Sequence, residues 1–328
     1  LASAQLIGMF VRLYSGEPGD WGAEALRVAH EAIAPLERAA AHGELAMAWR
    51  LIGFVHGVAG RYAQANAATV HYMDHARQAG NSRLVARSGM GFAIGALFGP
   101  EPVPKAIAQC EAIVAETSGD RQVQCIVRCV VAQLRAMNGE FDAARRLYHH
   151  ARSVLTELGQ GVIAASAGID LARVELLAGD LPGAEAAVRA DMAFLTQAGE
   201  TYLLSTMAAL LARIVRDQGR DAEALELSLA AEQAAASDDV EAQALWRAVR
   251  APILARSGQL AEAEALARAA LGFALGAEAP VLQADTWVEL ATVLRLAGQR
   301  AGADEALGKA HALYAAKGDR VSAARATV

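Results

Sequence analysis

Three arginines have the spacing of a candidate anion-binding site. Arg173 and Arg213 are 40 residues apart, and Arg216 follows three positions later, on the same face of any helix that carries Arg213. Guanidinium groups held in this way can bind a carboxylate or a phosphate through paired hydrogen bonds. Alternatively, the three side chains are solvated or are paired inside the protein, with Asp170 and Glu175 as the nearby acidic residues. The spacing alone leaves both interpretations open.

The other residues that could do chemistry form no catalytic or metal-binding pattern. His71 and His75 share one helix face, but Tyr72 stands where a zinc peptidase needs a glutamate. The chain contains no Gly-x-x-x-x-Gly-Lys-Ser/Thr phosphate loop, and the glycines within residues 89–95 fit a close helix crossing better than a nucleotide site. We therefore predict that the chain is not an enzyme and uses no cofactor or metal.

The three cysteines, Cys110, Cys125 and Cys129, are expected to be small buried residues. Cys125 and Cys129 share a helix face, but no convincing fourth ligand completes a zinc site. Low cysteine usage fits a reducing compartment, so the sequence predicts a cytoplasmic protein.

The composition predicts an all-α fold. Of 328 residues, 54% are apolar but only 5% are aromatic, so alanine and leucine supply most of the apolar bulk. Alanine is the strongest helix former, and no strand-like alternation appears. A net charge of −6 offers no basic face for nucleic acid. The longest nearly uncharged stretch, residues 88–100, has 13 residues. A membrane span needs about 20, so we expect a buried helix and no membrane partner.

The elements that must position these residues repeat about every 40 positions. In each copy a turn residue is followed five positions later by an alanine. These pairs are Asp20 with Ala25, Gly60 with Ala65, Gly139 with Ala144, Gly179 with Ala184, Gly219 with Ala224, Gly258 with Ala263 and Gly298 with Ala303. The 79 residues between Gly60 and Gly139 leave room for one degenerate copy at Gly99. Such a period is typical of a solenoid, in which each unit packs only on its neighbours.

Each copy contains two helices. In the second copy, helix A is expected over residues 44–59 and ends at Gly60, and helix B over residues 61–78 ends at Gly80. We predict one domain, a right-handed α-solenoid of about eight hairpins. The expected copies are 1–43, 44–80, 81–119, 120–159, 160–199, 200–239, 240–276 and 277–318, with 319–328 as the start of a capping helix.

Position by position, the unit resembles the tetratricopeptide repeat. That motif has a tryptophan, an apolar residue three positions on, a small residue directly after it, and then a glycine turn. The matching residues are Trp49, Ile52, Gly53 and Gly60 in the second copy, and Trp287, Leu290, Ala291 and Gly298 in the last. The resemblance covers about residues 5–318. It departs in the period, which is about 34 residues in the motif.

The longer unit resembles a narrower group, the C-terminal arms of large bacterial signalling proteins. These are adenylate/guanylate cyclases with an AAA-type ATPase and maltose-regulator-like activators. The stretches that carry this resemblance are residues 99–107 (GPEPVPKAI), 238–250 (DDVEAQALWRAVR) and 313–319 (LYAAKGD). It implies covalently attached effector domains upstream. A start at Leu1 without methionine fits a fragment of such a protein.

The resemblance also implies a concave face lined mainly by helix A. Counting six residues back from the turn glycines gives inward positions that include Gln133, Arg173, Arg213 and Thr292. With their neighbours, the candidate partner-binding residues are Arg50, Gln133, Asp170, Arg173, Arg213, Arg216, Glu289 and Thr292.

We expect a non-enzymatic regulatory domain of a larger bacterial signalling protein. This domain would recognise a protein or a peptide, and acidic partners are among the candidates. Two alternatives remain: a small-ligand sensor arm that controls an attached effector, and an oligomerisation scaffold. Peptide recognition predicts a long open groove. Sensing predicts a closed cavity with convergent polar groups, and oligomerisation predicts a large exposed apolar patch.

Overall fold

The computed structural model describes residues 2–15, 21–117, 119–199 and 203–327, and within these residues every regular element is a helix. The helices are α1 (Ala2–Ser15), α2 (Trp21–Arg38), α3 (His42–Val58), α4 (Tyr62–Gln78), α5 (Ser82–Phe98), α6 (Val103–Glu116), α7 (Arg121–Met137), α8 (Phe141–Glu157), α9 (Gly161–Ser166), α10 (Gly168–Ala178), α11 (Leu181–Gln197), α12 (Leu204–Asp217), α13 (Asp221–Ala234), α14 (Val240–Arg256), α15 (Leu260–Leu275), α16 (Pro280–Leu296), α17 (Arg300–Lys317) and α18 (Arg320–Arg325).

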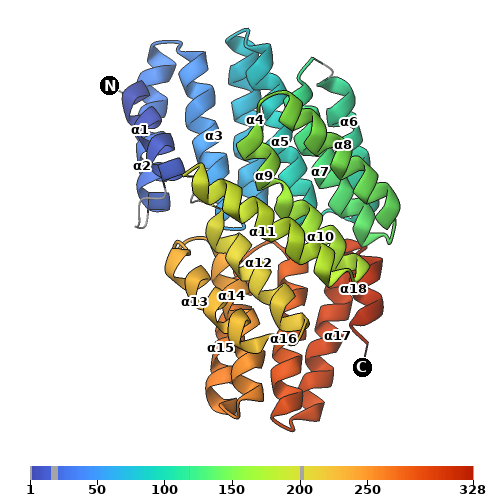
Figure 1. Cartoon of the computed structure of the whole chain (residues 1–328). Helices are drawn as coiled ribbons and strands as arrows, with labels where there is room; N and C mark the ends of the chain where they lie inside the picture. Colours follow the sequence, from blue (N-terminus) through green and yellow to red (C-terminus); the bar gives the residue numbers. More distant parts are fainter. Residues whose placement is uncertain (1, 16–20, 118, 200–202, 328) are drawn as a thin grey trace.

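Consecutive helices pack as hairpins, and successive hairpins stack (Figure 1). The pairs are α1 with α2, α3 with α4, α5 with α6, α7 with α8, α9 and α10 with α11, α12 with α13, α14 with α15, and α16 with α17. The interruption between α9 and α10 divides one helix A in two, and α18 follows the last pair. The structure therefore confirms the all-α solenoid of paired helices. Asp20, the turn residue expected in the first copy, lies outside the described residues.

Glycine ends helix A where the repeat predicts it. Gly60 has a φ of +68° and Gly139 one of +86°, a backbone region that glycine enters without a Cβ penalty. Gly99, the turn of the degenerate third copy, instead has a φ of −73° and an extended ψ. The third turn therefore has a different geometry, and counting back from Gly99 does not give the same helix face as in other copies.

Small side chains allow the helices to approach closely. The alanines that follow the turns, Ala144, Ala184, Ala224, Ala263 and Ala303, are completely buried. A Cβ added at Gly95 of α5 would lie 2.5 Å from Oδ1 of Asn66 on α4, and one at Gly91 would lie 2.9 Å from Oγ1 of Thr69. These distances confirm that the glycines of residues 89–95 mark a close helix crossing.

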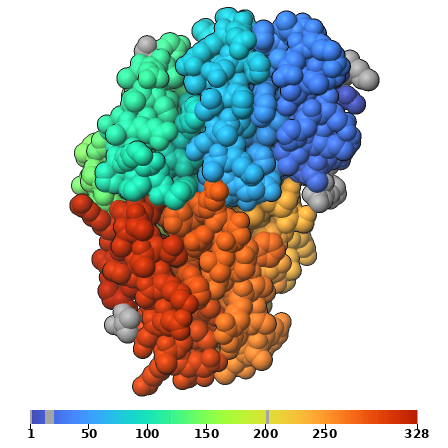
Figure 2. Space-filling model, turned by 180° about the vertical axis from the view of Figure 1, so that it is seen from behind, coloured from blue at the N-terminus to red at the C-terminus, as the bar shows by residue number. Residues whose placement is uncertain are grey.

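The stacked hairpins wind back on themselves. In Figure 1, α1 to α8 form one half, α9 to α12 cross diagonally in front, and α13 to α17 form the other half, with α18 returning beside α10. Seen from behind, the halves meet along a continuous seam (Figure 2). The concave sides of the helix A segments therefore face each other across the inside of a closed superhelix.

Candidate functional site: a cavity enclosed by the superhelix

A buried lysine joins the last hairpin to the third. Lys317, at the end of α17, is fully buried, and its Nζ donates hydrogen bonds of 2.8, 2.7 and 2.8 Å to the carbonyls of Ala96, Gly99 and Glu101. These carbonyls lie at and just beyond the C-terminal end of α5, where a cation is favourable. Burial lowers the pKa of Lys317 to about 8. This contact brings residues 99–107 and 313–319 together.

A second closing contact joins the turn between α3 and α4 to the loop between α15 and α16. The Glu278 amide donates to the Gly60 carbonyl at 2.8 Å, and its side chain accepts from the Ala63 amide at 2.7 Å. A Cβ at Gly60 would lie only 2.4 Å from the Cβ of Ala277. Glycine at this turn thus allows the left-handed backbone, and it also leaves room for Ala277 of the second half to pack against the turn.

The closed superhelix surrounds a cavity with two adjoining lobes. The N-terminal lobe, of about 480 Å³, lies mainly between α3, α4, α5 and α10. The C-terminal lobe, of about 460 Å³, lies mainly between α10, α12, α16 and α17. Both volumes are in the range of small-molecule sites. The residues that line both lobes are Tyr62, Leu97, Phe98, Arg173, Glu241, Ala279 and Leu282.

The boundary between the lobes is charged. Arg173 of α10 forms an ion pair with Glu241 of α14, and its guanidinium lies 5.1 Å from the ring centroid of Phe98. One turn earlier, Asp170 accepts a hydrogen bond from the Gln133 side chain. Burial raises the pKa of Asp170 to about 7, although Arg173 and the Gln133 bond oppose the rise.

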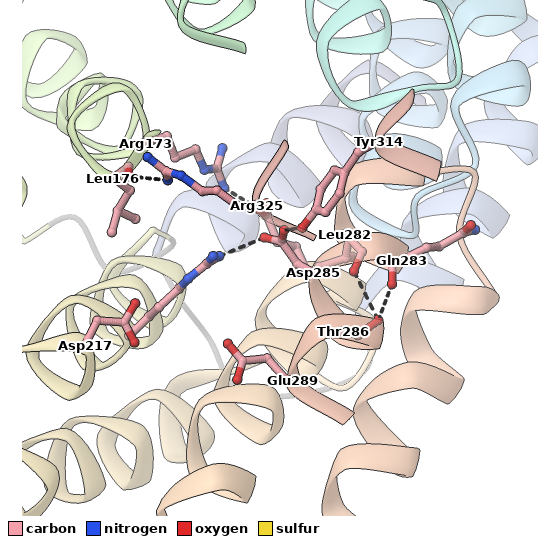
Figure 3. A network of polar contacts seen from close by, with 12 residues as sticks. Arg173, Leu176, Asp217, Leu282, Gln283, Asp285, Thr286, Glu289, Tyr314 and Arg325 are labelled. Atoms are coloured by element: carbon pink, nitrogen blue, oxygen red, sulfur yellow. Dashed lines mark hydrogen bonds and ion pairs between the residues drawn. The ribbon is translucent and has the colours of Figure 1, made fainter. Parts of the chain in front are cut away.

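The arginines of the C-terminal lobe are paired with acids on α16. Arg213 Nη1 donates to Asp285 Oδ2 at 2.7 Å, and the Tyr314 hydroxyl donates to the other Asp285 oxygen. Arg216 lies outside the lobe and binds both oxygens of Glu289, at 2.8 and 2.7 Å. Figure 3 shows Asp285 and Tyr314 pointing toward each other, with Glu289 farther along the same helix. The charge on Asp285 raises the pKa of Arg213.

These pairs bear on the two interpretations of the arginine spacing. Arg173, Arg213 and Arg216 are paired inside the protein, but not with the acids that sequence proximity suggested. Asp170 instead bonds Gln133, and Glu175 binds Arg145, whose Nε donates at 2.8 Å. The observed acids lie 68, 72 and 73 residues farther along the chain, two hairpins away.

The arginines of the N-terminal lobe are in a different situation. Arg50 of α3 lies 5.1 Å from the ring centroid of Phe10, and Arg87 of α5 makes a long contact of 3.4 Å with the Gln122 side chain. Within the described residues, neither guanidinium has a carboxylate within ion-pair distance. Tyr72 lies with them on the cavity wall, only 4% exposed, and its hydroxyl has no hydrogen-bond partner in the described part of the chain.

Some of the candidate residues named from the sequence lie at this cavity. Arg50, Gln133, Asp170, Arg173 and Arg213 line the cavity. Glu289 and Arg216 lie beside it in their buried pair, and Thr292 lies outside both lobes with its hydroxyl bonded to the Val288 carbonyl at 3.0 Å. The lining residues that the sequence analysis missed include Tyr72, Arg87, Asp239, Glu241 and Asp285. A usable signal was present on α4, where Tyr62, Thr69 and Tyr72 share one helix face.

Two further features of the described residues concern the geometry of metal sites and of membrane-spanning helices. Among them, no group of three or more His, Cys, Asp or Glu side chains is placed to hold a metal ion. The three cysteines are buried, as expected, and burial raises their pKa values. No helix in the described ranges combines the length and the apolar character needed to cross a membrane.

No protein-family model matches the chain, and no curated protein matches it. It is similar to the crystal structure of BtubC (BKLC) from P. vanneervenii, with 17% identity over 65% of this chain and 89% of that one and a TM-score of 0.46. It is also similar to the crystal structure of the APC/C hetero-tetramer Cut9-Hcn1, with 12% identity over 90% of this chain and 75% of that one and a TM-score of 0.46. The stacked hairpins described above define the chain as a tetratricopeptide-like helical repeat.

Proposed function

We propose that this chain is a non-enzymatic regulatory domain that binds a small ligand inside its superhelix. In this proposal the ligand stabilises the closed form and thereby controls effector domains attached in a larger bacterial, cytoplasmic signalling protein. The chain supplies recognition and closure, and chemistry belongs to the attached domains.

The meeting of the two halves of the superhelix around the helix A face is the observation that carries the proposal. An open solenoid would offer its helix A face as a long groove for a peptide. Here the contacts of Lys317 and Glu278 bring the two halves together around that face. Because residues of both halves line the cavity, a ligand that touches both halves would bind the closed state more tightly than an open one. Such differential affinity is what a sensor requires.

Recognition of a protein or peptide remains the second candidate function. It is favoured by Ile7 and Val11, four residues apart on the first helix, which are 63% and 61% exposed. A partner could cover this apolar pair at the end of the stack. Binding of an acidic peptide by Arg213 and Arg216 would require their pairs with Asp285 and Glu289 to open first.

Two glycine variants test the proposed link between closure and ligand binding. Gly60 and Gly80 have nearly equal φ values of +68° and +65°, so replacement by alanine strains the backbone equally. An added Cβ contacts Ala277 only at position 60, and at position 80 it meets nothing within 4 Å. In a thermal-shift screen with a library of small metabolites, we expect hits that stabilise the wild type and Gly80→Ala but not Gly60→Ala. A screen in which no compound stabilises the wild type, or in which all three proteins respond alike, would contradict the proposal.

A further inference from the structure

One face of α4 runs along the N-terminal lobe, and the charged residues at the two ends of this lobe differ in sign. Tyr62, Ala65, Thr69 and Tyr72 of this helix all line the lobe. The two tyrosines are ten positions apart in the helix, which corresponds to about 15 Å along the axis. The surroundings of Tyr72 and Tyr62 therefore report on opposite ends of the same lobe.

The end at Tyr72 is basic. Arg50 and Arg87 line the same lobe as Tyr72. Burial raises the pKa of the Tyr72 phenol, and the positive charges of these two arginines oppose the rise. Besides the Tyr72 hydroxyl, Nε of Arg87 is buried without a hydrogen-bond partner in the described chain. Unpaired donors in a protein interior are costly, so this end is suited to an anionic group that accepts hydrogen bonds.

The end at Tyr62 is acidic. Burial raises the pKa of Tyr62, and the negative charges of Glu241 and Asp239 raise it further. Asp170 lies on the wall of the same lobe. One arginine, Arg173, stands among these three carboxyl groups and is already paired with Glu241. Burial raises the pKa values of Asp170 and Asp239 to about 7, and Arg173 is occupied by Glu241. A second anionic group would find no unpaired cation here, so a ligand with negative charge at both ends is disfavoured.

The wall between the two ends is mostly apolar. It includes Phe54, Val58, Ile94, Val130 and Ile169 from four different helices. Such a wall recognises a hydrocarbon or aromatic body, and the polar ends fix its orientation.

Resting on the proposed function, we infer that the N-terminal lobe binds a small amphipathic monocarboxylate. Its carboxylate accepts hydrogen bonds from Arg50, Arg87 and the Tyr72 hydroxyl, and its apolar body extends along α4 toward Tyr62. Arg50 and Arg87 are the residues that select a carboxylic acid over the corresponding alcohol.

Matched acids and alcohols test this inference on the full chain. Octanoate, decanoate and 3-phenylpropionate are titrated by calorimetry beside octanol, decanol and 3-phenylpropanol. We expect at least one acid to bind at least tenfold more tightly than its alcohol, because a charge-assisted hydrogen bond to a buried donor is lost in the alcohol. Equal affinity of every acid and its alcohol overturns the inference but leaves ligand binding in the cavity standing. Failure of all six probes to bind overturns the inference, and the glycine variants then decide the proposed function separately.

Side-chain variants locate the carboxylate. Arg87→Gln and Arg50→Gln should each lower the affinity for the acid at least tenfold and leave the affinity for the alcohol unchanged. Tyr72→Phe keeps the packing of the ring and should lower the affinity for the acid by a smaller factor. Arg77→Gln is the control, because Arg77 lies on α4, the helix of Tyr72, but is exposed and paired with Asp74. If both cavity arginine variants bind the acid as tightly as Arg77→Gln does, the assignment of the carboxylate to this end is wrong.

Discussion

The two lobes of the cavity differ in whether the arginines at their far ends are paired with acidic side chains. In the C-terminal lobe, Arg213 is paired with Asp285, and Arg216 beside it is paired with Glu289. In the N-terminal lobe, Arg50 and Arg87 have no acidic partner within the described residues. Paired arginines at a buried contact hold two elements together, whereas unpaired ones at a cavity wall remain available to a ligand. This contrast supports the proposal that the N-terminal lobe recognises the ligand, whereas the pairs at the C-terminal lobe hold helices together.

Breaking the Arg216 pair should have the largest effect. Arg216→Ala leaves the Glu289 carboxylate buried and unpaired, which typically costs about 3–5 kcal/mol in the free energy of unfolding. Urea denaturation measures this loss. The double variant Arg216→Met with Glu289→Leu removes both charges and should lose less than the single variant. A loss below about 1 kcal/mol for Arg216→Ala would show that the pair is not structural.

The closing contact should come next. Lys317→Met removes the donor to three carbonyls at the end of α5, and we expect a cost of about 2–4 kcal/mol. Lys309→Met on the same helix is the control, since Lys309 is about half exposed and its ion pair with Glu305 lies at the surface, where such pairs contribute little to stability. Equal melting temperatures for the two variants would mean that closure does not depend on Lys317, and the lobes would then be formed without it.

A smaller and pH-dependent effect is expected at Asp170, between the lobes. Its pKa is raised to about 7, above the usual value of about 3.9 for an unfolded chain. The folded protein therefore holds this proton more strongly, and the wild type loses stability as the pH rises from about 4 to about 7. Asp170→Asn lacks this loss, so its stability relative to the wild type should rise progressively over that window. Denaturation curves at pH 4.5 to 8 measure the difference, and a difference independent of pH would refute the shift.

The smallest effect is expected for Arg87→Gln without ligand. Arg87 has no ion pair to lose among the described residues, so its replacement should change the free energy of unfolding by less than about 0.5 kcal/mol. Comparison with Arg216→Ala in the same denaturation assay sharpens the contrast between the lobes. A large loss at Arg87 would place it among the structural arginines instead.

The hairpins could be predicted from the sequence because their determinants are local. A left-handed glycine and an alanine five residues later act within one or two turns of helix, so spacing reveals them. The inward face could be predicted only where the turns are regular. Counting six residues back from Gly99 gives Ala93, which is completely buried, whereas Arg87 and Ile94 of the same helix line the cavity. The different backbone at Gly99 is one reason that Arg87 was missed.

The sequence by itself determined the helices, their pairing and the positions of most turns, because these follow from period, helix propensity and glycine. Only the tertiary structure decided that the solenoid closes, which acids pair with Arg173, Arg213 and Arg216, and which arginines remain unpaired. These outcomes depend on contacts between residues far apart in the chain, such as Lys317 with Gly99. They are set by the summed rotation of many stacked hairpins, and no single repeat encodes that sum.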